Sequence, residues 1–392
     1  MERIGIYGGA FNPPHLGHIR AAKSAVDSLG LSKLLLIPSC ISPHKKIPNG
    51  SPNPNQRLEM LAATVQGDTK IQVSDLELQR GGVSFTYETV QKLRGNYPDD
   101  ELVLLMGTDM FLSFENWKNP DVIIENASLG VFYRGERGEK QRIFAQKEKM
   151  ESVGAKVYLV ENPVTEISST DLRRMLVLGC ADGYLAPETV DYIRKNGLYG
   201  ISENYECLSV EKLESVVLSL LKPSRVNHVR GCREEAVKLA KFWGADEINA
   251  ARAALLHDVT KALDGPLQIH LCKCYGVSLD EFSKQNPKTL HALTGSLVAE
   301  RIFRENSKVV EAIRWHTTGK ADMSLLEKII YVADYMEPNR DFPGVEKLRE
   351  LAYTDIDDAL RCGLEMTLDM LRKQGREISR QSNEALQFLN NQ

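Results

Sequence analysis

Strand-like and helix-like segments alternate up to about residue 165, and this alternation constrains the fold more than any other feature of the sequence. Short apolar runs are separated by helical patterns, and glycine, proline or asparagine stands at most of their ends. Such alternation is typical of βα units, in which helices connect parallel strands. We therefore predict a Rossmann-like α/β domain with a mainly parallel sheet, built on the strands Ile4–Tyr7, Leu34–Ile37, Ile71–Val73, Leu102–Met106, Leu129–Tyr133 and Val157–Val160.

After residue 206 no comparable strand pattern occurs, and apolar residues recur at helical spacing instead. The polar segment Asn196–Glu206 separates the two kinds of sequence. We predict an α/β domain over residues 1–200 and an all-α domain over 206–392, with a frayed tail after Gln381. Two unlike domains indicate two separable activities. The expected helices cover residues 211–221, 233–244, 248–263, 294–303, 324–336 and 356–374.

Composition and charge exclude several classes of protein. A chain of 392 residues is longer than one hydrophobic core usually serves. Its net charge of −4 argues against broad binding to nucleic acid, which depends on a basic surface. No apolar run approaches the roughly 20 residues that span a bilayer, no signal-peptide pattern is present, and the seven cysteines include no C-x-x-C. We expect a cytoplasmic protein without nucleic-acid or membrane partners; a homo-oligomer is compatible with the sequence.

The stretch GGAFNPPHLGHI follows directly on the first strand. Its two glycines allow a tight turn and a close approach of the backbone to a ligand. Asn12 is a favourable N-cap and proline suits the first helical position, so a helix is expected to begin at Pro13 or Pro14. His15 and His18 would then share one face of its first turn, beside the free N–H groups. The combination predicts a phosphate site that is neither a G-x-G-x-x-G motif nor a P-loop.

A second segment, EISSTDLRRML, follows the last predicted strand and opens a helix. Ser168 or Ser169 can cap this helix, and Ser168 with Asp171 resembles a capping box. The hydroxyl groups, the helix N-terminus and Arg173 together can also clamp a polyphosphate. The ordinary alternatives are a simple cap here and incidental histidines in the first stretch.

GGAFNPPHLGH and ISSTDLR together resemble the two signatures of the nucleotidyltransferase superfamily with the H-x-G-H motif. Residues 1–200 are similar to bacterial nicotinate-mononucleotide adenylyltransferases, and GVSFTYETV and MGTDMFLSFENW match their substrate-side segments. The resemblance implies ATP contacts from Gly8, Gly9, Ala10, Phe11, His15, His18, Ser168, Ser169, Thr170 and Arg173. It implies nicotinate-nucleotide contacts from Thr86, Tyr87, Asp109 and Trp117, with Trp117 on the pyridine ring. His44 and Lys45, in a proline-rich loop, are either phosphate contacts or solvated surface.

The implied reaction needs no protein nucleophile, because the phosphate of nicotinate mononucleotide attacks the α-phosphorus of ATP and pyrophosphate leaves. Positioning and electrostatics carry such a reaction. His15 and His18 would stabilise the transferring phosphoryl group, Arg173 would hold the leaving phosphates, and Mg²⁺ would enter with ATP. A pantetheine phosphate or cytidylyl substrate is the rival interpretation, against which Trp117, Thr86 and Asp109 argue.

Six potential metal ligands lie in the helical region: His228, His257, Asp258, His291, His316 and Asp334. Asp334 interrupts an otherwise apolar helix, where an unpaired carboxylate is unfavourable. One helical histidine is usually a satisfied core residue, but these six occupy five segments and lack zinc-finger spacing. Their convergence in a bundle would give mixed nitrogen and oxygen ligation, which suits iron, manganese or zinc. Six ligands point to two ions with one bridging carboxylate.

The adjacent His257–Asp258 pair resembles that of HD-domain metallophosphohydrolases, and residues 206–380 are similar to bacterial symmetrical diadenosine-tetraphosphatases. The similarity lies in NHVRGCREEAVKLAKFWGAD, LLHDVTK and HTTGKADMSLLEKIIYVADYMEPNRDFPGVEKLRELA. It implies two divalent ions, with iron favoured and manganese or zinc as alternatives. One ion would be held by His228, His257, Asp258 and Asp334, and the other by Asp258, His291 and His316.

Lys261, one helical turn beyond His257, and Arg340 are expected to contact substrate phosphates; an exposed loop arginine is the ordinary alternative for Arg340. The implied reaction is the hydrolysis of diadenosine tetraphosphate to two ADP. Residues 257–261 read HDVTK, whereas guanosine-polyphosphate hydrolases carry HDxxED. We therefore do not favour guanosine-polyphosphate hydrolysis as the activity. A competing hypothesis from another class is a nucleotide-sensing module without turnover. The small-molecule substrates expected for the whole chain are thus ATP, nicotinate mononucleotide and diadenosine tetraphosphate.

Overall fold

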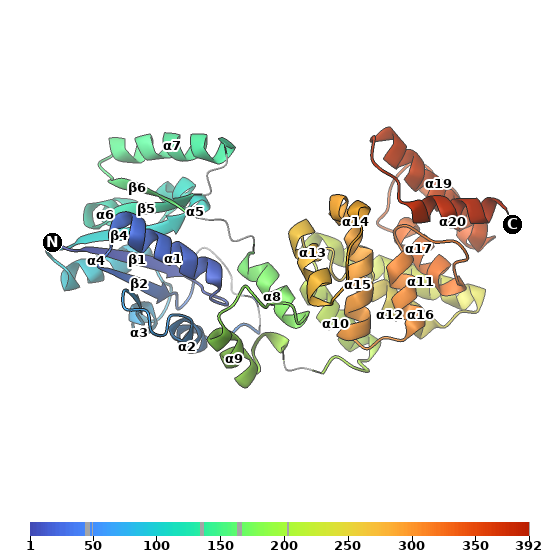
Figure 1. Ribbon diagram of the computed structural model, residues 1–392, viewed down its shortest axis with the longest axis horizontal. Coiled ribbons are helices and arrows are strands. Elements are labelled where there is room, and N and C mark those ends of the chain that lie inside the picture. Colours follow the sequence, from blue (N-terminus) through green and yellow to red (C-terminus); the bar gives the residue numbers. More distant parts are fainter. Residues whose placement is uncertain (44–47, 49, 134–136, 163–166, 202–203, 392) are drawn as a thin grey trace. The chain divides into compact units, whose positions relative to one another are not determined.

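A computed structural model describes residues 1–43, 48, 50–133, 137–162, 167–201 and 204–391 of the chain. The chain divides into two compact units, Met1–Glu203 and Asn204–Gln392, and each is described by itself (Figure 1). The division falls within the polar segment that separates the two kinds of sequence. Among the described helices, none combines the length and apolar character that crossing a membrane requires.

The first unit is built on a six-stranded parallel sheet in the order β3-β2-β1-β4-β5-β6. The strands are β1 (Arg3–Gly9), β2 (Lys33–Pro38), β3 (Ile71–Val73), β4 (Glu101–Gly107), β5 (Ser128–Tyr133) and β6 (Val157–Glu161). All six predicted strands are therefore present, and the α/β fold with a parallel sheet is confirmed. The order of connection reverses between β1 and β4, so their carboxyl ends flank the place where such sheets bind ligands.

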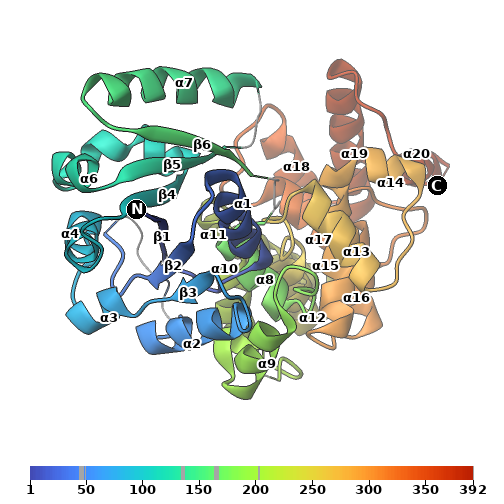
Figure 2. The same ribbon diagram turned by 60° about the vertical axis from the view of Figure 1, so that its left-hand side comes forward.

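Alternate residues of the strands enter two separate cores, one on each face of the sheet. Ile4 and Ile6 of β1 pack on one face with α4, α6 and α7, whereas Leu34 and Leu36 of β2 pack on the other face with α1 and α2. Both views show α7 running beside β6 (Figure 1, Figure 2). The helices of this unit are α1 (Leu16–Leu29), α2 (Pro54–Thr64), α3 (Leu76–Arg80), α4 (Thr86–Asn96), α5 (Thr108–Leu112), α6 (Pro120–Asn126), α7 (Arg137–Ser152), α8 (Ser169–Val177) and α9 (Pro187–Lys195).

The described residues of the second unit form helices joined by turns and loops, without a strand, as predicted (Figure 1). Its centre is formed by α11, α12, α15, α16 and α17, which pack against one another. The helices are α10 (Val210–Leu220), α11 (Val226–Trp243), α12 (Glu247–Leu256), α13 (Gly265–Cys274), α14 (Glu281–Gln285), α15 (Leu290–Arg301), α16 (Ser307–Trp315), α17 (Leu325–Met336), α18 (Val345–Ala352), α19 (Ile356–Lys373) and α20 (Arg380–Asn390).

Three local predictions were wrong. The first helix begins at Leu16 rather than at Pro13 or Pro14, because His15 takes the extended N-cap conformation. The helix expected over 248–263 ends at Leu256, and His257 is its C-cap, so Asp258 lies in the following turn. The tail after Gln381 is not frayed in its described part, because α20 buries Ser382, Ala385 and Leu389 at helical spacing.

Candidate active sites

The first site lies at the carboxyl ends of β1 and β4, in a cavity of about 640 Å³. Gly8 and Gly9 end β1 on its rim, and Met106 and Gly107 end β4. The N-terminal residues of α8 and the start of α4 complete the wall. Most of the residues predicted to bind the two nucleotides line this cavity: Gly8, Gly9, Ala10, Phe11, His18, Thr86, Trp117, Ser168, Ser169, Thr170 and Arg173.

Among the described residues, three of the predicted contacts are not in the wall of this cavity: His15, Tyr87 and Asp109. Asp109 lies on α5 with its side chain exposed, and the hydroxyl of Tyr87 donates a hydrogen bond to Glu88 at 2.9 Å. His15 is buried behind His18 rather than on the cavity surface. Ser168 caps α8 by accepting a hydrogen bond from the Asp171 N–H at 3.1 Å, as expected. His44 and Lys45 fall outside the described residues.

The rings of His15 and His18 are stacked, with centroids 3.7 Å apart. His15 is the N-cap of α1, and its backbone N–H donates to Nδ1 of His18 at 3.2 Å. A neutral imidazole that accepts at Nδ1 carries its proton on Nε2. His18 can therefore offer an N–H donor to an oxygen in the cavity, in a position that the turn preceding α1 fixes.

Burial lowers the pKa of His15 to about 4, so its ring is neutral near pH 7. In the unfolded chain this group takes up a proton near pH 6.5, whereas the folded chain resists protonation down to about pH 4. The free energy of unfolding should therefore fall as the pH falls from about 6.5 to 4, by about 3 kcal/mol in total from this group. His15→Gln should flatten that dependence in urea-unfolding curves. Equal pH slopes for His15→Gln and wild type would contradict the prediction.

Arg57 is a structural residue of this site that the sequence analysis did not find. Its side chain is fully buried, and it donates to the carbonyl oxygens of Ala10 and Ser39, each at 2.6 Å. Arg173 similarly donates to the carbonyl oxygen of Asn12 at 2.7 Å, and Tyr199 donates to the Asn12 side chain at 2.7 Å. These contacts hold the glycine-rich turn from three directions. The sequence did not reveal the role of Arg57, because each of these contacts joins segments that are far apart in the sequence.

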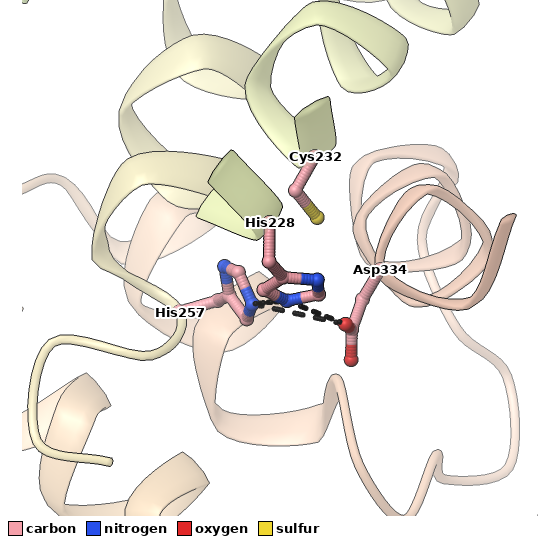
Figure 3. Close-up of side chains that lie close together, drawn as sticks. All are labelled: His228, Cys232, His257 and Asp334. Carbon is pink, nitrogen blue, oxygen red and sulfur yellow. Dashed lines mark hydrogen bonds and ion pairs between the residues drawn. The ribbon is translucent and has the colours of Figure 1, made fainter. Parts of the chain in front are cut away.

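The second site brings together residues from five segments of the helical unit. His228 projects from α11, His257 and Asp258 follow α12, His291 lies on α15, His316 follows α16 and Asp334 lies on α17. Figure 3 shows His228, His257 and Asp334 converging, with Nε2 of His228 3.1 Å from an oxygen of Asp334 and 3.3 Å from Nε2 of His257. All six residues predicted as metal ligands are thus neighbours in space.

Asp258 lies between the two groups of histidines. Its carboxylate is 3.6 Å from Nε2 of His257, 3.7 Å from Nε2 of His228 and, through its other oxygen, 3.4 Å from Nε2 of His291. Nε2 of His316 is 3.2 Å from Nε2 of His291. A carboxylate in this position has one oxygen for each group, which is the arrangement expected of a bridging ligand.

The opposite nitrogen of every one of these rings is already engaged. Nδ1 of His257, His291 and His316 donates to the backbone carbonyl three residues earlier, at 2.6, 2.9 and 2.7 Å, and Nδ1 of His228 donates to Glu337 at 3.0 Å. Such outer hydrogen bonds fix the tautomer and direct the Nε2 lone pair toward a metal. Burial lowers the pKa of His291 to about 3 and that of His316 to about 4, which keeps both rings in the neutral form that binds cations. The donor set therefore fits divalent ions.

Three further residues of this site were missed by the sequence analysis. Cys232, four residues after His228 on α11, belongs with His228, His257 and Asp334 to a group that could hold an ion (Figure 3). Arg225 pairs with Asp258. Glu337 is 1% exposed and supports His228. Of the predicted phosphate contacts, Lys261 places its ammonium 2.9 Å from Nε2 of His291, and Arg340 lies 2.8 Å from an oxygen of Asp334.

Glu337→Gln should weaken metal binding by about 10- to 100-fold. The second carboxylate oxygen of Glu337 accepts two hydrogen bonds from Asn339, each at 2.7 Å, so a glutamine would lose the charge behind His228 or turn its amide nitrogen toward donors. Competition with a chromogenic chelator measures the change. Glu346→Gln, at an exposed glutamate of the same unit, is the matched control, and equal affinities of the two variants would refute this role.

Comparisons with known proteins assign both halves of the chain. The cytidylyltransferase-like family matches residues 6–175, and the HD domain matches residues 225–339. A protein of Dictyoglomus thermophilum named "probable nicotinate-nucleotide adenylyltransferase" is 36% identical over 198 residues, which are 50% of this chain and 99% of that protein. The chain belongs to the nicotinate-nucleotide adenylyltransferase family and carries a C-terminal HD domain. In this family member, the cavity of the first unit and the histidine cluster of the HD domain are thus separate sites.

The HD domain has relatives of its own. A symmetrical bis(5'-nucleosyl)-tetraphosphatase of Halalkalibacterium halodurans is 42% identical over 166 residues, which are 41% of this chain and 88% of that protein. The crystal structure of an HD superfamily hydrolase from Clostridium acetobutylicum, described as involved in NAD metabolism, is 36% identical and covers 47% of this chain and 98% of that one, with a TM-score of 0.46. The resemblance predicted from the sequence is confirmed for both halves.

Proposed function

We propose that the chain is a bifunctional enzyme that transfers adenylate to nicotinate mononucleotide and hydrolyses diadenosine tetraphosphate symmetrically. The observation that carries the first activity is the cavity that joins the glycine turn, His18 and Arg173 to Thr86 and Trp117. The named activity of the relatives that the first unit spans almost completely supports it.

In the proposed transfer, an oxygen of the nicotinate mononucleotide phosphate forms a bond to the α-phosphorus of ATP, and the bond to the pyrophosphate oxygen breaks. Nε2–H of His18 donates to the transferring phosphoryl group, and His15 holds that ring by stacking. Arg173 and the N-terminus of α8 bind the leaving phosphates. Backbone N–H groups at the N-terminus of α4, near Thr86, donate hydrogen bonds to the nicotinate carboxylate, and Trp117 stacks on the pyridine ring. Mg²⁺ enters with ATP.

The observation that carries the second activity is the convergence of the Nε2 atoms of three histidines on Asp258 and Asp334, with Nε2 of a fourth, His316, 3.2 Å from Nε2 of His291. Two divalent ions held there, with iron favoured, would supply a nucleophilic water and neutralise phosphate charge. Lys261 and Arg340 stand beside the ligands and orient the phosphate chain of the substrate. Attack in the middle of the tetraphosphate releases two ADP.

One set of incubations tests both activities. Purified chain should release pyrophosphate from ATP with nicotinate mononucleotide, and more slowly with nicotinamide mononucleotide. With Fe²⁺ under anaerobic conditions, or with Mn²⁺, it should convert diadenosine tetraphosphate to ADP alone. Absence of pyrophosphate with either nucleotide would overturn the first proposal. Binding of diadenosine tetraphosphate without turnover would replace the second with a sensing role, and formation of ATP and AMP would contradict the symmetrical mode.

A further inference from the structure

The HD domain contains a cavity of about 570 Å³ that lies beside the predicted metal ligands. Lys261 and His291 form the wall shared with the cluster. From there the cavity extends between the segment of α13, α14 and α15 and the segment that follows α19. A substrate phosphate at the metal ligands would therefore have its remaining atoms directed into this space.

We propose that this cavity binds one nucleoside-diphosphate half of the substrate, with Arg376 and Lys288 on the phosphates and Phe282 against the base. The inference rests on the proposed phosphohydrolase function and assigns it a specificity site. Diadenosine tetraphosphate has two such halves, each with a complete nucleoside, and the cavity holds one of them.

The charges of the cavity favour an anion. Arg376 and Lys288 line it, and among the described residues neither makes an ion pair or a side-chain hydrogen bond that would neutralise it. The two acidic residues of the wall are engaged instead: Asp264 caps α13 by accepting from the Leu267 N–H at 3.0 Å, and Glu377 accepts from Asn286 at 3.4 Å. Exposed cations that converge on one cavity attract phosphate groups.

The rest of the wall suits a nucleoside. Phe282 is half-buried and lies with Leu263, Pro287 and Leu371 on the apolar part of the lining, where an aromatic ring can stack on a base. The hydroxyl oxygen of Thr317, also in the wall, is buried and has no hydrogen-bond partner among the described residues. A buried hydroxyl without a partner is unfavourable unless a ligand supplies one.

The turn between α19 and α20 positions Arg376 at the cavity wall. The helix α19 ends at Lys373, and Gly375 adopts a φ of +62°, which glycine tolerates best. The N–H of Arg376 then donates to the carbonyl oxygen of Leu371 at 3.0 Å, which closes the turn. The next helix, α20, begins at Arg380, so the short connection holds Arg376 between two packed helices.

The test compares Arg376→Ala with Arg372→Ala in the full, Mn²⁺-loaded chain. Arg372 is an exposed arginine four residues earlier, paired with Asp369 and outside the cavity wall. Arg376→Ala should raise KM for diadenosine tetraphosphate roughly tenfold or more while kcat changes less than about threefold, because loss of a charged hydrogen bond weakens ground-state and transition-state binding alike. Phe282→Ala should raise KM likewise, and Arg372→Ala should match wild type.

Titration with ADP separates this proposal from the function on which it rests. If the wild type does not hydrolyse diadenosine tetraphosphate, the phosphohydrolase proposal fails, yet ADP binding should still weaken roughly tenfold in Arg376→Ala and not in Arg372→Ala. Binding at the first unit is common to all variants and cancels in the comparison. Pyrophosphate, which lacks the nucleoside, should distinguish wild type from Arg376→Ala but not from Phe282→Ala. An Arg376→Ala chain that binds ADP as tightly as Arg372→Ala would overturn the proposal.

Discussion

Asp258→Asn should lower the hydrolysis of diadenosine tetraphosphate by roughly 10³-fold or more, and the purified variant should retain less metal. The carboxylate of Asp258 lies within 3.7 Å of three of the clustered histidines, so its replacement should affect both proposed ion positions at once. Asparagine has nearly the same shape but lacks the negative charge and one of the two oxygen ligands. Steady-state ADP formation and elemental analysis of the protein measure the two effects.

Two controls make this result specific. Asp322→Asn changes an exposed aspartate of the same unit and should leave both activity and metal content at wild-type levels. Pyrophosphate release by the first unit should also be unaffected in Asp258→Asn, because all of the residues around that cavity lie before residue 200. Wild-type metal content together with wild-type turnover in Asp258→Asn would remove the di-metal centre from the proposal.

His18→Ala should lower kcat for adenylyl transfer by on the order of 10²–10³ while KM for ATP changes little. The reason lies in the position of Nε2–H, which the hydrogen bond between the His15 N–H and Nδ1 of His18 directs into the cavity. A donor of this kind stabilises charge that develops on the transferring phosphoryl group more than charge already present in ATP. Pre-steady-state and steady-state pyrophosphate release distinguish the chemical step from product release.

Arg20→Ala is the matched control for His18→Ala, since Arg20 is an exposed residue of the same helix. His18→Asn gives a second comparison, because its amide can still donate a hydrogen bond and should recover part of the lost rate. If His18→Ala and Arg20→Ala had the same kcat, His18 would have no part in the chemical step.

The sequence predicts the arrangement of this protein well wherever local pattern decides it. The six strands are read from apolar runs that pack on both faces of a sheet, and the α/β and all-α halves from the change of periodicity. The predicted metal ligands also lie together, because an aspartate in an apolar helix such as Asp334 requires partners and histidines are the partners available. Their assignment as ligands stays a prediction.

What the sequence could not supply are contacts that depend on tertiary structure. Arg57 and Glu337 look like ordinary polar residues of helical or loop segments, and their roles appear only when Ala10 or His228 is brought beside them. Tyr87 and Asp109 stand in segments that resemble the family but are not in the cavity wall formed by the described residues, so their roles as nucleotide contacts stay predictions. Helix ends were missed where a side chain such as His15 takes the capping position.

The hydrogen bonds from Nδ1 of His257, His291 and His316 to backbone carbonyls should affect which metal ion the HD domain binds in the cell. Rings anchored in this way cannot turn aside to leave room for the water shell that Mg²⁺ keeps, so the HD domain should discriminate against the very ion that accompanies ATP to the other half. If both proposed activities hold, the two halves draw on different pools of cations. A shortage of transition metal would then stop the hydrolysis of diadenosine tetraphosphate, while adenylyl transfer to nicotinate mononucleotide continued.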